Sequence, residues 1–142
     1  MNSIDIFKLL IKIEAIKIST DEPFTFSSGI SSPIYCDNRV LISAPNERNQ
    51  IIDAMLTQIE PLIATTDVIA GTATAGIPHA AWLADRLDKP MVYVRSKPKA
   101  HGQKNQIEGK LEPGQRVLVI EDLISTGNSV INAVMALREA GA

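Results

Sequence analysis

The chain has 142 residues, with 14 lysines and arginines against 16 aspartates and glutamates, so its formal net charge at neutral pH is −2. This length predicts one domain with a sizeable core, and the small charge argues against a general attraction to nucleic acid or anionic lipid. The single cysteine, Cys36, excludes an intramolecular disulfide and fits a reducing compartment.

The N-terminal segment, residues 1–17, has apolar residues at helical spacing with charged residues between them. The apolar positions are Ile4, Phe7, Leu10 and Ile11. This pattern predicts an amphipathic helix rather than a signal peptide. Because no apolar run in the chain approaches the roughly 20 residues of a membrane span, we expect a soluble cytoplasmic protein.

Residues 20–45 are rich in Ser, Pro, Gly and Asp and contain two short apolar pieces, 24–26 and 34–36. This composition predicts short strands and turns that form a small cap, here called the hood. We therefore expect an N-terminal helix and hood over residues 1–45 and a core over residues 46–142, in one domain overall.

The core alternates between strand and helix patterns. Strands are predicted at 67–70, 91–94 and 117–120, and helices at 51–63, 78–87 and 130–140. This alternation predicts an α/β fold with a parallel, doubly wound sheet and helices on both faces. Residues 138–142 have the pattern of a helix end, after which another strand would normally follow, so we expect a core that lacks its C-terminal part.

A loop of small residues follows the first core strand and comprises Thr72, Ala73, Thr74 and Ala75. The flanking Gly71 and Gly76 have the spacing of a nucleotide P-loop, but the lysine that such a loop needs after the second glycine is missing, which argues against ATP hydrolysis. Small residues let backbone N–H groups approach an anion closely, which predicts a pyrophosphate loop. The alternative is that they only allow tight packing between strand and helix.

Residues 95–116 form a long polar segment with six basic and two acidic residues. Connections longer than about 12–15 residues are usually functional or disordered. An extended backbone would place four alternating residues on one side: Arg95, Lys97, Lys99 and His101. We interpret the segment as a mobile cationic clamp in which His101 can supply a proton, whereas His79 is interpreted as structural. A solvated charged face is the alternative.

The strand pattern Val117–Ile120 runs directly into two acids, Glu121 and Asp122. Four apolar residues predict a central parallel strand covered on both faces, and open α/β sheets bind ligands at its carboxyl end. The next residues supply hydroxyls and backbone N–H groups that can bind a phosphate at a helix N-terminus. These residues are Leu123, Ile124, Ser125, Thr126, Gly127, Asn128 and Ser129. The combination predicts a sugar phosphate as ligand, with a solvated strand end and turn as the alternative.

This stretch resembles the phosphoribosyl-pyrophosphate signature of the type I phosphoribosyltransferases: four apolar residues, two acids, two apolar residues and a Ser/Thr/Gly loop. More specifically, the chain resembles the orotate phosphoribosyltransferases of Gram-positive bacteria in five segments: 24–29, 32–39, 70–77, 95–102 and 121–129. The resemblance implies the type I fold and the transfer of ribose 5-phosphate from phosphoribosyl pyrophosphate to orotate, which gives orotidine monophosphate in pyrimidine biosynthesis. It also implies a Mg²⁺-dependent homodimer whose mobile loop closes over the partner's site.

The resemblance also implies roles for single residues. Glu121 and Asp122 would bind the ribose hydroxyls, and residues 123–129 would hold the 5-phosphate. Pyrophosphate would be met by Arg95, Lys99 and His101. The catalytic residues would be Lys99, His101 and Asp122.

Orotate would be contacted by Ser125, Tyr35 and Ser27, although enteric relatives carry a lysine where this chain has Ser27. No protein residue is expected to bind Mg²⁺ directly, since the ion would be held mainly through the substrate. Two alternatives stay open at this point. One is a purine phosphoribosyltransferase, and the other is a non-catalytic regulator that senses phosphoribosyl pyrophosphate.

Overall fold

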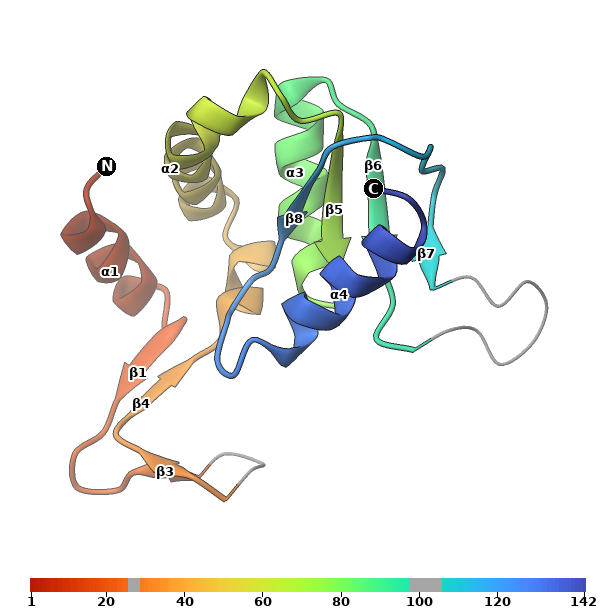
Figure 1. The fold of residues 1–142 in the computed structure, drawn as a ribbon. Helices are drawn as coiled ribbons and strands as arrows, with labels where there is room; N and C mark the ends of the chain where they lie inside the picture. The colour runs from red at the N-terminus through yellow and green to blue at the C-terminus, as the bar shows by residue number, and fades with distance from the viewer. Residues whose placement is uncertain (26–28, 98–105) are drawn as a thin grey trace. The chain divides into compact units, whose positions relative to one another are not determined.

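The computed structural model describes residues 1–25, 29–97 and 106–142, and Figure 1 shows the ribbon. The chain divides into two compact units, Met1–Ala54 and Met55–Ala142, and each is described by itself. The predicted boundary between hood and core falls at the start of helix α2, Pro45–Ile63, whereas the two units divide within that helix.

The first unit begins with helix α1, Ser3–Lys12. Asn2 caps it: the Asn2 side chain accepts a hydrogen bond from the backbone N–H of Asp5 at 2.9 Å, and the Asp5 carboxylate accepts one from the Asn2 N–H at 3.3 Å. The predicted extension of this helix to residue 17 is wrong. Glu14 has a left-handed φ of 59°, and the chain then enters strand β1, Ile16–Ile18.

The hood consists of two antiparallel pairs of short strands. β1 pairs with β4, Ile34–Cys36, and β2, Phe24–Thr25, pairs with β3, Ser31–Ser32. The two apolar pieces, in which the sequence predicts strands, form β2 and β4. Their partner strands, β3 and β1, are not predicted by the sequence. The 3₁₀ helix η1, Asn38–Ser43, then leads to α2.

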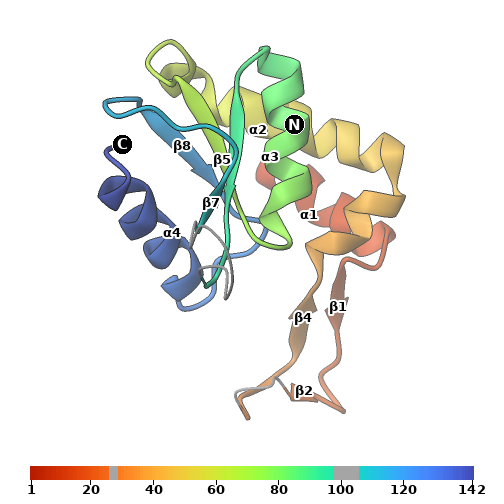
Figure 2. The ribbon, with the colours of Figure 1, turned by 90° about the vertical axis from the view of Figure 1, so that its right-hand side faces the viewer.

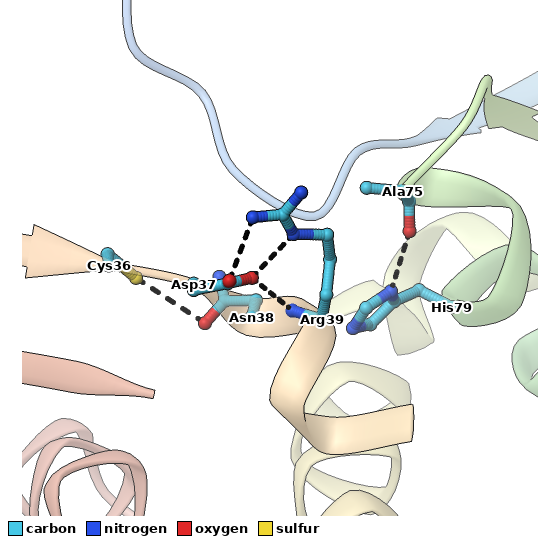
Figure 3. A network of polar contacts seen from close by, with 6 residues as sticks. All are labelled: Cys36, Asp37, Asn38, Arg39, Ala75 and His79. Atoms are coloured by element: carbon cyan, nitrogen blue, oxygen red, sulfur yellow. Dashed lines mark hydrogen bonds and ion pairs between the residues drawn. The ribbon is translucent and has the colours of Figure 1, made fainter. Parts of the chain in front are cut away.

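Asp37 caps η1 and is held by Arg39 (Figure 3). The Asp37 carboxylate accepts hydrogen bonds from the Arg39 backbone N–H at 3.1 Å and from its guanidinium at 2.6 and 2.8 Å. These contacts lower the pKa of Asp37 below its usual range. The pair therefore fixes the turn between β4 and η1.

The second unit contains a four-stranded sheet in the order β7-β6-β5-β8. β5, Val68–Thr72, runs parallel to both β6, Met91–Val94, and β8, Val117–Ile120, while β7, Ile107–Glu108, is antiparallel to β6. Helices α3, Gly76–Leu87, and α4, Asn128–Glu139, cover opposite faces of this sheet (Figure 2). The predicted parallel sheet with helices on both faces is confirmed, with β7 as an antiparallel addition.

β5 is the centre of this unit, and all five of its residues are buried. Toward α4, its Val68 and Ala70 belong to a cluster of buried residues completed by Val92, Val94, Ala133, Ala136 and Leu137. Each large apolar side chain buried in this way contributes about 1.5–3 kcal/mol. Toward α3, a Cβ on Gly71 would lie 2.9 Å from the Cβ of Ala80, so α3 sits very close to the strand.

Two sequence predictions about strands need correction. Within the described residues β8 pairs only with β5, so it is not the central strand that its sequence predicted. An apolar run shows that both faces are covered, but it does not show that both edges are paired.

The second correction concerns residues 95–116, which include β7. Ile107 packs against the core cluster and pairs with Val94.

Within the described ranges, none of the helices combines the length and apolar character that crossing a membrane requires.

Candidate functional site

The two predicted anion loops begin at the same edge of the sheet. β5 and β8 are parallel neighbours, and Gly71 of β5 stands opposite Ile120 of β8. The loop of residues 72–75 after β5 leads into α3, and the loop of residues 121–127 after β8 leads into α4. This edge carries the carboxyl ends of the parallel strands, where α/β sheets bind ligands.

The 72–75 loop is tightly packed. Thr72 is only 2% exposed, and the Ala73 N–H donates to the carbonyl oxygen of Val94 at 2.8 Å. The peptide bond between Ala73 and Thr74 is cis. A Cβ on Gly76 would collide with Thr72 Oγ1 and would lie 2.7 Å from the carbonyl oxygen of Ile120. Only glycine therefore fits at position 76.

Helices α3 and α4 both start without a side-chain cap. Their N-cap residues, Ala75 and Gly127, make no side-chain cap hydrogen bond in the described structure, and neither helix has an acidic residue in its first turn. By contrast, Asn2 caps α1. The first backbone N–H groups of α3 and α4 thus lack a side-chain acceptor, and the helix dipole adds positive potential there. Both helix starts suit an anion.

A small hollow of about 60 Å³ lies in the loop before α4. Its lining is Glu121, Leu123, Ile124, Ser125, Thr126, Gly127, Asn128, Ser129 and Val130. Apart from Asp122, every residue that we predicted for the sugar phosphate from 121 to 129 takes part in this lining. Because a water molecule occupies about 30 Å³, the hollow holds a group of only a few heavy atoms, such as a phosphate.

Glu121 accepts three hydrogen bonds. Its Oε1 accepts from the Thr72 hydroxyl at 2.5 Å and from the Asp122 N–H at 3.2 Å, and its Oε2 accepts from the Ser129 hydroxyl at 2.8 Å. The half-buried carboxylate is thus bound to both loops and to the first turn of α4.

Asp122 retains its proton to a higher pH than an ordinary aspartate. Burial is the largest cause of its raised pKa, followed by the hydrogen bond with Glu121 and by the like charge of that neighbour. His79 acts in the opposite direction, since its electrostatic interaction with Asp122 lowers the pKa of that carboxyl. Burial and the interactions with Glu121 and His79 therefore decide how readily Asp122 ionises.

His79 lies on α3 and is 3% exposed. Its Nδ1 is 3.2 Å from the carbonyl oxygen of Ala75 (Figure 3), so this nitrogen donates the hydrogen bond. The imidazole ring also makes an edge contact with Trp82, with ring centroids 5.3 Å apart. These contacts agree with the structural role expected of His79, and they place it behind the 72–75 loop.

Arg95 follows β6 and lines two further hollows. One, of about 80 Å³, is lined by Thr72, Ala73, Val94, Arg95, Ser96, Ser129, Asn132 and Ala133. The other, of about 490 Å³, is lined by Ala73, Thr74, Ile77, Tyr93, Arg95, Ser96 and Lys97. Ser129 is shared with the phosphate-sized hollow, so the three hollows adjoin one another along this edge.

The backbone of Arg95 is held at the base of the long polar segment. Its N–H donates to the carbonyl oxygen of Gln106 at 2.8 Å, and the Gln106 side chain donates to the Arg95 carbonyl at 3.0 Å. The Arg95 guanidinium lies 3.7 Å from the carboxylate of Glu108 on β7. The pattern of a polar run gave no signal for this pairing, since Gln106 and Glu108 are eleven and thirteen residues further along the chain.

The remaining predicted site residues are Lys99, His101, Ser27 and Tyr35. Lys99, His101 and Ser27 fall outside the described residues, so the structure places only Asp122 among the three predicted catalytic residues. Tyr35 lies on β4 in the first unit, where its ring centroid is 5.6 Å from that of Phe24. The structure thus brings the phosphate loop, the pyrophosphate loop and Arg95 together.

Metal binding by the protein alone has little support in the described part of the chain. It contains no group of three or more His, Cys, Asp or Glu side chains that could hold a metal ion. At the loop edge the adjacent carboxylates are those of Glu121 and Asp122, and Glu121 already accepts three hydrogen bonds.

The chain is similar to known proteins along most of its length. Residues 43–142 match the family model of the phosphoribosyl transferase domain. The chain is 58% identical over 137 residues to an orotate phosphoribosyltransferase of Coxiella burnetii, an alignment that covers 96% of this chain and 66% of the relative. It is also 58% identical to an orotate phosphoribosyltransferase of Staphylococcus saprophyticus, with 96% and 68% covered.

A solved structure, that of the orotate phosphoribosyltransferase from Aeropyrum pernix, matches with a TM-score of 0.82 and 36% identity, and covers 94% of this chain and 73% of that one. The chain spans about two thirds of the length of its curated relatives, between 63% and 68% in the most similar of them.

Proposed function

Since this chain belongs to the phosphoribosyl transferase domain family and has the type I phosphoribosyltransferase fold, we propose that it serves as an orotate phosphoribosyltransferase. The reaction would transfer ribose 5-phosphate from phosphoribosyl pyrophosphate to orotate and release pyrophosphate. One observation supports this most directly. Two uncapped helix starts meet at one sheet edge, with an acid pair at the end of the strand between them.

The proposed substrate has two anionic groups on one sugar, and the site has two anion loops. The 5-phosphate would occupy the hollow of residues 123–129 at the start of α4. Pyrophosphate would bind at the 72–75 loop and the start of α3, with Arg95 beside it. The ribose would lie between these groups with its hydroxyls on the acid pair, Glu121 and Asp122. Ser129 lines two adjoining hollows and marks where the two parts of the substrate meet.

The chemistry follows from charge. When pyrophosphate leaves, positive charge develops on the ribose ring, as in other glycosyl transfers. An ionised Asp122 would stabilise that charge, while the N–H groups of the first turn of α3 would stabilise the negative charge of the leaving group. Because burial raises the pKa of Asp122, ribose hydroxyls that donate to its carboxylate would favour the ionised form that the reaction needs.

Mg²⁺ fits this site only together with the substrate. The ion prefers oxygen ligands and usually keeps several waters, with one or two carboxylates and substrate phosphates completing its shell. Asp122 is the side chain here that would face such an ion, with Glu121 next to it. When bound, Mg²⁺ would neutralise part of the charge of the pyrophosphate.

The resemblance to relatives adds further features to the proposed function. They are the roles of Lys99 and His101 at the pyrophosphate, the orotate contacts of Ser125, Tyr35 and Ser27, the homodimer with shared sites, and the cytoplasmic location. The choice of orotate itself is supported by the names of the relatives, which are 58–59% identical to this chain.

The test is orotate consumption, followed by absorbance after phosphoribosyl pyrophosphate and Mg²⁺ are added. It should be run on the 142-residue chain and on a chimera that carries the C-terminal third of the Coxiella burnetii relative. Asp122→Asn in the active protein should lower turnover by about 10²-fold or more, as expected when one group that stabilises charge in the transition state is lost.

Asp85→Asn on the exposed side of α3 is the matched control and should leave turnover unchanged. Consumption of hypoxanthine or adenine instead of orotate would replace the proposal with a purine phosphoribosyltransferase. Binding of phosphoribosyl pyrophosphate without consumption of any base would indicate the sensing regulator.

A further inference from the structure

Arg95 comes directly after β6, and its backbone continues the pairing of β6 with β7. In that antiparallel pairing Tyr93 stands opposite Glu108. Two residues further along, the Arg95 N–H donates to the Gln106 carbonyl oxygen at 2.8 Å, which extends the same register. The Gln106 side chain donates to the Arg95 carbonyl oxygen at 3.0 Å. The backbone of Arg95 is therefore held at a fixed place beside the sheet.

The register also decides which side chains share a face. Successive residues of a strand point to opposite faces of the sheet. Val94 and Ile107 belong to the apolar cluster that packs against α4. Arg95 and Glu108 therefore lie on the opposite face, toward α3. They are diagonal neighbours across the two strands, a separation that long side chains can bridge, and Arg95 Nη1 lies 3.7 Å from Glu108 Oε1.

This face of the sheet borders the hollow of about 490 Å³ beside the 72–75 loop. Arg95 lines it together with Ala73 and Thr74 of that loop and with Ile77 in the first turn of α3. The N-cap residue of α3, Ala75, makes no side-chain cap hydrogen bond in the described structure. An arginine and an uncapped helix start thus border one space, and both favour an anion.

The ion pair with Glu108 leaves Arg95 able to bind a ligand. A guanidinium offers five N–H donors, and Arg95 Nε is buried without a hydrogen-bond partner among the described residues. The 3.7 Å separation from Glu108 is longer than a hydrogen bond, and the Arg95 side chain is 41% exposed. An ion pair of this kind is weak. It can orient the guanidinium without preventing a phosphate from binding there.

We propose that Glu108 is a positioning residue: its carboxylate holds the Arg95 guanidinium beside the start of α3, ready for the pyrophosphate of the substrate. The inference rests on the proposed function, because it concerns the pyrophosphate of phosphoribosyl pyrophosphate. A long side chain loses rotamer freedom when a ligand immobilises it, and this loss weakens binding. Glu108 restricts the rotamers of Arg95 before the ligand arrives, so less freedom is lost on binding.

The experiment is calorimetric titration of the 142-residue chain, in the presence of Mg²⁺, with phosphoribosyl pyrophosphate, pyrophosphate and ribose 5-phosphate. Glu108→Ala should weaken the first two ligands by about fivefold, the effect of ordering one long side chain. Ribose 5-phosphate, which lacks the pyrophosphate, should bind as before. Glu108→Gln keeps a side-chain oxygen that can accept from the guanidinium, so it should bind within about twofold of the unchanged chain.

A double-mutant cycle tests whether Glu108 acts through Arg95. Arg95→Ala should weaken pyrophosphate by more than Glu108→Ala does, because it removes the cation itself. The double variant should bind pyrophosphate as Arg95→Ala does, since no guanidinium is left to position.

Glu112→Ala is the matched control. The Glu112 carboxylate is 55% exposed, forms an ion pair with Lys110 at 2.7 Å, and lines neither of the two hollows beside Arg95. This variant should bind all three ligands as the unchanged chain does. If Glu108→Ala does not fold, Glu108→Thr takes its place, because threonine favours strands and is too short to reach the guanidinium.

Three results would overturn the inference. Additive losses in the double variant would show that Glu108 acts independently of Arg95. Unchanged or tighter pyrophosphate binding in Glu108→Ala would show that the carboxylate does not prepare the guanidinium for the ligand. Equal weakening of all three ligands would indicate a general disturbance of the fold. Failure of the proposed function looks different, because the unchanged chain would then bind none of the three ligands, and the inference would fall with it.

Discussion

The loops after β5 and β8 both lead into uncapped helices, yet they are built in opposite ways. The first is closed around its own backbone, with Thr72 buried and no space for a Cβ at Gly76. The second is open, and residues 123–126 are exposed. At Gly127 the nearest atom to an added Cβ would be Ile131 Cδ1 at 3.8 Å, which is an ordinary contact.

The two glycines therefore serve different needs. Gly76 is required because a side chain has no room, whereas Gly127 is required because its φ of 81° is unfavourable for other residues. One loop is fixed by packing and the other by backbone conformation. The position of the first loop therefore depends on its close packing, and that of the second on the left-handed conformation of Gly127.

The largest expected effect is that of Gly76→Ala. The new methyl group would overlap Thr72 Oγ1 and the Ile120 carbonyl oxygen, and neither belongs to a flexible side-chain end. Overpacking of this kind destabilises a fold by about 3 kcal/mol. Urea denaturation followed by circular dichroism would measure the change, and an effect below about 1 kcal/mol would show that the loop yields.

Gly127→Ala should have a smaller effect, of about 1 kcal/mol, since it introduces left-handed strain but no overlap. The same denaturation experiment measures it beside Gly76→Ala. Equal effects of the two substitutions would remove the distinction between a loop fixed by packing and a loop fixed by conformation.

Asp122→Asn tests the electrostatics of the open loop. It should change the free energy of unfolding by less than Gly127→Ala does. Burial and Glu121 raise the pKa of Asp122, so its ionised form destabilises the fold. At neutral pH the Asn variant should be the more stable protein. The difference should shrink as the pH falls through the raised pKa and vanish below the usual value near 3.8, where both states are protonated.

Denaturation curves at several pH values would measure this difference. If the difference in free energy of unfolding between the two proteins does not change with pH, folding does not raise the pKa of Asp122. Such a result would place the electrostatic distinction between the loops in doubt.

Asp37→Asn should have the smallest effect and the opposite sign. Arg39 lowers the pKa of Asp37, so the ion pair stabilises the fold above the usual aspartate range and is lost as the pH falls through the lowered pKa. Because the Arg39 side chain is largely exposed, the loss should be only about 0.3 kcal/mol. Denaturation at neutral pH and at two acidic values would show the deficit disappear.

The order of strands and helices in the core could be predicted because its signals are local. Val117–Ile120 is apolar and bounded by polar residues, and β8 has those bounds. The same run could not show that β8 is paired on one side, since pairing depends on distant segments. β7 has only two residues within a polar stretch, so no periodicity marks it.

The site, like the fold, could be predicted where its signals are local. Glu121, Asp122 and the residues after them form a local motif, and the structure keeps them at one edge. The contact between Glu121 and Thr72 joins residues 49 positions apart, and no pattern in the sequence connects them. That contact holds Glu121, and burial is the largest cause of the raised pKa of Asp122. Neither is marked in the sequence, so the two neighbouring acids could not be distinguished beforehand.

The position of β8 has a practical consequence for handling the 142-residue chain. Within the described residues, one side of this strand has no hydrogen-bonded neighbour. Its side chains are Val117, Leu118, Val119 and Ile120. An apolar strand with an unpaired edge is a template for strands of other molecules, and aggregation starts at such edges. Preparations of this chain should therefore scatter more light as concentration rises, and dilute solutions are the ones in which its folding and binding can be measured.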